Sequence, residues 1–161
     1  MNQNRFTGWS IWDKRNDLDN TNYPGVYAIR ISQKSLAGRK FSWHKEIVYI
    51  GMTNAITGLR GRLKAFDDTI GGKSVRHGGG DRFKFQHQNY DEVVEKLYVS
   101  VARFKADVTS KTPKNLRVMG DVARFEFQCL AKYVESYGEL PEFNDMQKSK
   151  KHSLTYGRNN L

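Results

Sequence analysis

The sequence predicts an α+β fold, a small three-stranded antiparallel-rich sheet flanked by helices. Three short segments are rich in β-branched and aromatic residues, and two other segments repeat apolar residues at helical spacing. Along the chain they follow the order strand, strand, helix, strand, helix. A chain of 161 residues is long enough to build one such domain around its own core.

Each predicted strand is bounded by turn-forming or polar residues. Segment 25–32 (GVYAIRIS) follows Pro24, and segment 46–52 (EIVYIGM) is almost entirely apolar, which is typical of a central strand. The polar stretch 33–45 between them predicts a long hairpin connection, so we expect these two strands to be antiparallel neighbours. Segment 96–104 (KLYVSVARF) alternates along its length and predicts the third strand.

Two segments show helical periodicity. Residues 58–70 carry one apolar stripe, formed by Leu59, Leu63, Phe66 and Ile70. A longer helix is predicted from Asp121, a favourable N-cap, to Tyr137. Residues 71–90 are rich in glycine and basic residues without an apolar period and predict a long irregular loop, and residues 105–116 predict a polar loop.

Three regions are expected along the chain. Residues 1–24 form an N-terminal arm that we expect to pack on the domain through its tryptophans, and residues 25–145 form the domain itself. Residues 146–161 form a basic tail without an acidic residue, which predicts a mobile segment or a phosphate-contacting arm that includes Arg158.

The charge balance indicates a polyanionic partner. Twenty-seven Lys and Arg residues oppose seventeen Asp and Glu residues, which gives a net charge of +10. Such a domain suits nucleic acid because neutralising phosphates releases their condensed counterions. The alternatives are a basic protein without an anionic partner and a ribosome-type RNA binder.

Cysteine content and hydropathy exclude other classes. Cys129 is the only cysteine, so the chain has neither an internal disulfide nor a cysteine-rich zinc site. No segment has the apolar length of a signal peptide or a membrane span, which predicts a cytoplasmic protein without a membrane partner.

Two charged residues lie on or beside the apolar sides of the predicted helices. Glu126 falls in the middle of the apolar side of the second helix, between Val122 and Leu130. An unpaired buried carboxylate is costly, so Glu126 needs either a metal ion or a buried ion pair with an arginine. Arg62 lies beside the apolar stripe of the first helix, where it can clamp a phosphate or extend along the surface to solvent.

Motifs on the first two strands and the first helix resemble those of the GIY-YIG nuclease family. Residues 25–27 (GVY) are similar to the first signature and residues 48–51 (VYIG) to the second, and they lie on adjacent predicted strands. Residues 59–63 (LRGRL) resemble the helix that carries the catalytic arginine of that family. This resemblance places the role of that arginine on Arg62.

The resemblance extends over residues 24–145. The helix of Glu126 is similar to the metal-binding helix of the family, and LPEFN resembles the segment that closes the domain with an asparagine, here Asn144. One position departs from the pattern, because Phe66 stands where the family often has His or Tyr. His77 or Arg82 is a candidate to replace the phosphate contact that Phe66 cannot make.

The resemblance implies a GIY-YIG-like fold and hydrolysis of phosphodiester bonds with one Mg²⁺ or Mn²⁺ ion, bound by Glu126. Arg62 would neutralise charge on the phosphate, and Asn144 would complete the catalytic set. Tyr27 is the candidate general base, supported by Tyr49. The alternative for both tyrosines is ordinary packing within strands.

Basic residues in the predicted hairpin and loop, together with one on the first helix, are candidates for contacting nucleic acid. They are Arg39, Lys40, Lys45, Arg60, Lys73, Arg76, His77 and Arg82. A flexible solvated connection is the alternative interpretation of the 71–90 loop.

The sequence thus predicts a metal-dependent DNA endonuclease, of the restriction type or encoded by a phage or mobile element. Double-stranded or branched DNA is the expected substrate, and cutting both strands with one active site per chain favours a homodimer or sequential nicking. The alternatives are a catalytically silent nucleic-acid-binding module on the same fold, which Phe66 favours, and a nuclease directed at RNA.

Overall fold

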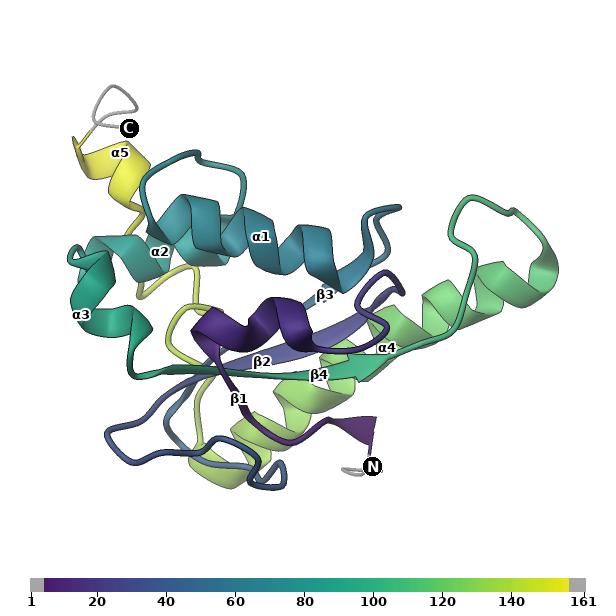
Figure 1. The fold of residues 1–161 in the computed structure, drawn as a ribbon, viewed down its shortest axis with the longest axis horizontal. Helices are drawn as coiled ribbons and strands as arrows, with labels where there is room; N and C mark the ends of the chain where they lie inside the picture. The colour runs from purple at the N-terminus through teal and green to yellow at the C-terminus, as the bar shows by residue number, and fades with distance from the viewer. Residues whose placement is uncertain (1–4, 157–161) are drawn as a thin grey trace.

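The computed structural model describes residues 5–156 and confirms an α+β fold (Figure 1). Its elements in chain order are β1 (Ser10–Ile11), the 3₁₀-helix η2 (Trp12–Asp17), β2 (Gly25–Ile31), β3 (Ile47–Thr53), α1 (Gly58–Ile70), α2 (Gly78–Gln86), α3 (Tyr90–Val94), β4 (Leu97–Arg103), α4 (Pro113–Tyr137) and α5 (His152–Tyr156). None of the helices in this part of the chain combines the length and apolar character needed to cross a bilayer.

The sheet has four antiparallel strands in the order β1-β4-β2-β3, so the expectation of three strands is wrong. The additional strand comes from the N-terminal arm, where Ser10 pairs with Val99 of β4. A strand of two residues is too short to show an alternating apolar pattern. It is defined by its pairing with β4 and not by its own sequence. The arm is also anchored by Trp9 and Trp12, which are 2% and 0% exposed.

The expectation that segment 46–52 forms a central strand is wrong as well, because β2 is paired on both sides and β3 lies at the edge. Its apolar character has another cause: β3 contacts α1 and α4 as well as β2. Its outer edge is also covered, since the backbone N–H of Phe143 donates to Val48 O at 2.9 Å. An edge strand covered in this way can be as apolar as a central one.

Side chains alternate between the two faces of the sheet and form two cores. On the face of α1, η2 and α2, the core includes Trp12, Tyr27, Ile29, Tyr49, Leu63, Phe66, Phe83 and Val101. On the face of α4, the core includes Trp9, Val26, Ala28, Ile50, Ala102, Val122, Phe125 and Cys129. Figure 1 shows α1 and α2 above the sheet, and α4, whose first turns lie beyond the sheet, crossing its other face.

The prediction of an irregular loop over residues 71–90 is wrong, because this region contains α2 and the start of α3. The sequence Gly78-Gly79-Gly80 has low helix propensity and no apolar period. The helix is stabilised by its surroundings instead: the His77 side chain caps its first turn, and Phe83 packs against Phe66 with ring centroids 5.6 Å apart.

The long helix α4 begins at Pro113, well before the predicted start at Asp121. Thr112 is the N-cap and accepts a hydrogen bond from the N–H of Asn115 at 3.4 Å, while Pro113 occupies the first turn. Proline is favoured there because its missing N–H would have no intrahelical partner. The helix ends as expected at Gly138, which adopts φ +80°.

The basic tail is docked over its described part, whereas Arg158 lies outside the described residues. The N–H and hydroxyl of Ser153 at the start of α5 donate to the Asp81 carboxylate at 3.0 and 2.5 Å. Asp81 is 3% exposed, so this contact holds α5 against α2.

Candidate active site

Two tyrosines on neighbouring strands lie side by side at the centre of the candidate site. Tyr27 on β2 is paired with Gly51 on β3, and Ile29 is paired with Tyr49, so the two tyrosines are diagonal neighbours on one face. Their ring centroids are 5.9 Å apart. The two signature segments are thereby brought together by the antiparallel register of β2 and β3.

Gly51 leaves the space that both tyrosine rings occupy. A Cβ atom at this position would lie 2.6 Å from Tyr27 Oη and 2.7 Å from a ring carbon of Tyr49. Gly79 at the start of α2 is equally constrained, because a Cβ atom there would lie 2.3 Å from the Tyr49 ring. Both glycines are therefore required by close approach to the same pair of side chains.

Substitution of Gly51 by alanine is expected to lower stability by about 1–3 kcal/mol, because the added methyl group must displace a buried tyrosine ring. The exposed Gly120, which has no atom within 4 Å of an added Cβ, provides the matched control within α4. Chemical denaturation of both alanine variants measures the difference. Equal stabilities of the two variants would contradict the packing described above.

Arg62 projects from α1 towards the two tyrosines. Burial lowers its pKa, but interaction with the hydroxyls of Tyr27 and Tyr49 raises it, and the net shift is upward. Its Nε is buried and has no hydrogen-bond partner, and no carboxylate of residues 5–156 forms an ion pair with it. A half-buried guanidinium with an unused donor is ready to bind an oxyanion.

The Arg62 side chain borders a hollow of about 370 Å³ next to the connection between β3 and α1. Its other lining residues are Met52, Thr53, Asn54, Ala55, Thr57, Gly61 and Ala65. Apart from Arg62 none of them is ionisable, so the guanidinium supplies the charge of this hollow.

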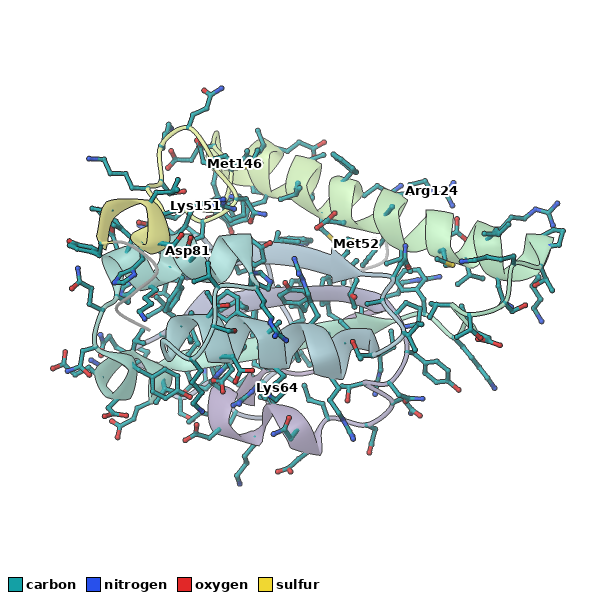
Figure 2. All side chains as sticks on the ribbon, turned by 90° about the horizontal axis from the view of Figure 1, so that it is seen from above. Met52, Lys64, Asp81, Arg124, Met146 and Lys151 are labelled. Atoms are coloured by element: carbon teal, nitrogen blue, oxygen red, sulfur yellow. The ribbon has the colours of Figure 1, made fainter. Side chains whose placement is uncertain are left out.

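Glu126 reaches the site from α4, on the opposite face of the sheet. It is half-buried, as the helical pattern predicts. Burial raises its pKa, whereas the Arg62 charge and a backbone hydrogen bond from Met52 lower it, with a net upward shift. Figure 2 shows Met52 at the border between the sheet and α4. Arg62 and Glu126 therefore influence each other across β3 without forming a direct ion pair.

Glu126 supplies a carboxylate that could act as a ligand of a divalent metal ion such as Mg²⁺ or Mn²⁺. Among the described residues, no group of three or more His, Cys, Asp or Glu side chains is placed to hold a metal. Mg²⁺ keeps several water ligands and commonly takes one or two carboxylates together with phosphate oxygens. The single half-buried carboxylate of Glu126 is compatible with that coordination, and its partial exposure leaves room for water and phosphate.

His77 lies inside the site, although the sequence suggested a place in an exposed loop. Its side chain is 1% exposed, and Nε2 lies 2.6 Å from Tyr27 Oη. Phe66 packs edge-on against the imidazole with ring centroids 5.0 Å apart. Burial, reinforced by Arg62 and Arg82, lowers the pKa of His77 to about 3. The contact with Tyr27 has no sequence signal beyond the position of His77 before three glycines.

Asn144 and Arg82 hold the closing segment instead of facing the hollow next to Arg62. The Asn144 amide accepts from the N–H of Ile50 at 2.8 Å and donates to the Ile50 carbonyl at 2.7 Å, as a neighbouring strand would. Arg82 Nε donates to the Phe143 carbonyl at 2.9 Å, and its side chain is 7% exposed. Both residues thereby hold the closing segment against the outer edge of β3.

The other candidate nucleic-acid-binding residues are exposed on several elements. They are Arg39, Lys40 and Lys45 between β2 and β3, Arg60 on α1, and Lys73 and Arg76 after α1. The hairpin connection folds back on the N-terminal arm, where the N–H of Trp9 donates to the Arg39 carbonyl at 2.9 Å. Arg60 shares helix α1 with Arg62.

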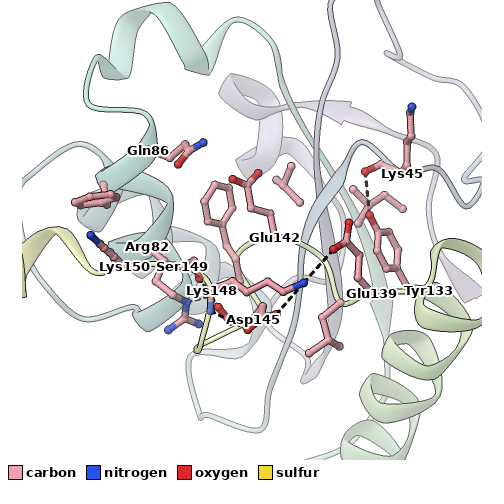
Figure 3. A pocket seen from close by; sticks show the side chains of 15 residues that line it. Lys45, Arg82, Gln86, Tyr133, Glu139, Glu142, Asp145, Lys148, Ser149 and Lys150 are labelled. Carbon is pink, nitrogen blue, oxygen red and sulfur yellow. Dashed lines mark hydrogen bonds and ion pairs between the residues drawn. The ribbon is translucent and has the colours of Figure 1, made fainter.

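A larger hollow of about 460 Å³ lies on the other side of the closing segment (Figure 3). Its lining carries both signs of charge, and Lys148 is paired with Glu139 at 3.2 Å and with Asp145 at 3.9 Å. Neither Arg62 nor Glu126 lines it. Three carboxylates, Glu139, Glu142 and Asp145, line this hollow among its basic residues, whereas no carboxylate of residues 5–156 lines the one next to Arg62, so the latter is better suited to a phosphate.

No protein-family model, curated protein or solved structure matches this chain.

Proposed function

We propose that this protein is a metal-dependent DNA endonuclease that hydrolyses phosphodiester bonds at the site formed by Arg62, Tyr27, Tyr49 and Glu126. The observation that carries the proposal is the half-buried Arg62 guanidinium, which has an unused donor and no ion-pair partner among the described residues. An arginine left in this state beside two phenols and near a carboxylate suits the binding of a phosphate group.

Arg62 holds the scissile phosphate and stabilises the charge that develops on its oxygens. The guanidinium presents several donors in one plane, which matches two phosphate oxygens. Partial burial strengthens this interaction because less water screens it. Arg62 thus both binds the phosphate and stabilises the transition state.

Glu126 is the residue that would hold one Mg²⁺ or Mn²⁺ ion. When bound, such an ion polarises the phosphate and stabilises the leaving oxygen. The carboxylate must be ionised to hold it, and the Arg62 charge together with the Met52 hydrogen bond favours that form against the effect of burial.

Tyr27 and Tyr49 orient the attacking water through their hydroxyl groups, and Tyr27 is the candidate general base. Burial raises the pKa of both, further for Tyr27 than for Tyr49, while Arg62 lowers both. Both phenols are therefore neutral near pH 7 and act first as hydrogen-bonding groups. A phenol can act as a base only after losing its own proton, and the Arg62 charge, which lowers both pKa values, would favour that ionised form.

DNA is the proposed partner because the chain carries a net charge of +10. The exposed basic residues named above provide phosphate contacts outside the site. A restriction-type or phage- or mobile-element-encoded nuclease is the proposed biological setting, with two copies acting together to cut both strands of a duplex.

Cleavage of supercoiled plasmid in the presence of Mg²⁺ or Mn²⁺ tests the proposal. The wild-type protein is expected to nick and then linearise the plasmid, and EDTA is expected to stop it. Glu126→Gln is expected to slow cleavage about 100-fold at limiting metal concentration, because it removes the ionised ligand. Glu135→Gln is the matched control, since this carboxylate lies on the exposed side of the same helix.

The outcomes separate the proposal from its alternatives. Equal cleavage by wild type and Glu126→Gln would remove Glu126 from the metal site. Salt-sensitive DNA binding without cleavage, with or without metal, would contradict the nuclease and support the silent binding module. Stronger competition by RNA than by DNA would redirect the proposal to an RNA substrate.

A further inference from the structure

Hydrogen bonding at the start of α2 determines which nitrogen of His77 carries its proton. The N–H of Gly80 points at His77 Nδ1 with a distance of 3.0 Å. A backbone N–H can only donate, so Nδ1 must be the unprotonated nitrogen. His77 is neutral near pH 7, since burial and the charges of Arg62 and Arg82 lower its pKa to about 3. The single imidazole proton therefore lies on Nε2.

The position of this proton determines the direction of the hydrogen bond between His77 and Tyr27. Nε2 lies 2.6 Å from Tyr27 Oη, so the imidazole donates and the phenol oxygen accepts. The hydroxyl hydrogen of Tyr27 must then point to another acceptor. Burial raises the pKa of both tyrosines, and the hydrogen bond between them further raises that of Tyr27 and lowers that of Tyr49. The neighbouring phenol is Tyr49, whose ring centroid lies 5.9 Å from that of Tyr27, and the opposite pKa effects agree with Tyr27 as the donor and Tyr49 as the acceptor.

We propose that His77 is a positioning residue of this site, locked by its capping role in the Nε2–H form so that it directs a relay of hydrogen bonds from His77 through Tyr27 to Tyr49. The inference deepens the proposed function and rests on it for the catalytic consequence. His77 touches neither phosphate nor metal in this role. It keeps the Tyr27 oxygen occupied as an acceptor and turns its hydroxyl towards Tyr49.

The surroundings of His77 keep this arrangement fixed. Phe66 and Tyr49 both pack edge-on against the imidazole, with centroid distances of 5.0 and 5.4 Å. The charged groups that act on His77 are Arg62 on α1 and Arg82 on α2, and neither is a carboxylate that could draw a proton onto the imidazole. The Glu126 carboxylate acts on Tyr49, at the other end of the relay. Phe66 thus supports the relay by packing, without a polar group of its own.

Two substitutions separate the two hydrogen bonds of His77. In His77→Asn the amide oxygen occupies roughly the position of Nδ1, so the helix cap is retained while the contact with Tyr27 is lost. In His77→Gln the longer amide reaches Tyr27 and can donate to it, while Gly80 loses its partner. A purely structural role of His77 as a cap and a positioning role in catalysis predict opposite results for this pair.

We expect His77→Asn to unfold at nearly the wild-type denaturant concentration, to bind DNA as tightly, and to cleave it about tenfold more slowly or worse. We expect His77→Gln to be less stable than His77→Asn and yet to cleave faster. Wild-type cleavage by His77→Asn would overturn the proposal, as would slower cleavage by folded His77→Gln than by His77→Asn.

The tautomer of the His77 imidazole can be measured without DNA or metal. NMR of the imidazole nitrogens in the labelled full-length protein reports the tautomer, and the His77→Asn spectrum assigns the His77 signals. The Nε2–H form is expected near neutral pH. Finding the Nδ1–H form or a protonated ring would overturn the lock even if the protein cleaves DNA. Finding the Nε2–H form in a protein that cleaves nothing would instead overturn the proposed function and the catalytic role together.

Discussion

Substitution of Arg62 by alanine is expected to slow plasmid cleavage by about 1,000-fold. Among the described residues, the guanidinium is the only charged group that lines the hollow next to the connection between β3 and α1. Removing a preorganised donor from a partly buried phosphoryl-transfer site typically costs two to three orders of magnitude or more. The fold should remain intact, because Arg62 forms no ion pair within residues 5–156 and its Nε has no partner there.

Arg60 provides the matched control for this experiment. It lies two residues earlier on the same helix and is exposed, so Arg60→Ala removes the same charge without entering the site. Arg60→Ala should weaken DNA binding modestly and in a salt-dependent way. Arg62→Lys should recover little activity, since an ammonium lacks the planar set of donors. Similar cleavage rates for Arg60→Ala and Arg62→Ala would remove Arg62 from the proposed mechanism.

Acidification is expected to destabilise the protein through His77. The pKa of His77 is about 3 in the folded protein and near 6.5 when the residue is exposed on unfolding. Between these values the unfolded chain binds one more proton than the folded protein, so the free energy of unfolding falls as the pH falls. The slope from this one residue is about 1.4 kcal/mol per pH unit, or about 2 kcal/mol between pH 6.5 and pH 5.

Chemical denaturation near pH 7 and near pH 5 measures this effect. His77→Asn keeps the cap but has no titratable group at this position. Its loss of unfolding free energy over the same interval should therefore be smaller than that of the wild type by about 2 kcal/mol. The partly buried His87, whose pKa burial also lowers, contributes in the same direction in both proteins. An equal loss of stability in wild type and His77→Asn would contradict the buried neutral state of His77.

The parts of the fold with a regular pattern were predictable. Strands β2, β3 and β4 and helix α1 have the residues expected, because their apolar periods reflect burial on known faces. The start of α4 was not predicted, although Thr112 and Pro113 form an ordinary helix start. The error arose because the first turns of α4 lie beyond the sheet and lack a continuous apolar stripe.

The candidate site likewise combines features that the sequence predicted with features that depend on tertiary packing. Arg62 and Glu126 attract attention in the sequence because each places a charge on or beside an apolar helix face, and the structure finds both half-buried. That they approach the same edge of β3 from opposite faces depends on how α1 and α4 pack. The roles of Asn144 and Arg82 in holding that edge depend on contacts between segments about 60 to 90 residues apart.

The sequence by itself determined the α+β class, the antiparallel pairing of the two signature strands, and the candidate pair of arginine and glutamate. These features follow from local propensity and from apolar periods, which any chain segment displays without its partners. Only the tertiary structure decided that β3 is an edge strand, that a fourth strand comes from the N-terminal arm, and that His77 lies buried against Tyr27. The reason is physical: a two-residue strand, a glycine-rich helix and a buried histidine are each stabilised by partners distant in the chain, and such partners leave no periodic trace in the residues they stabilise.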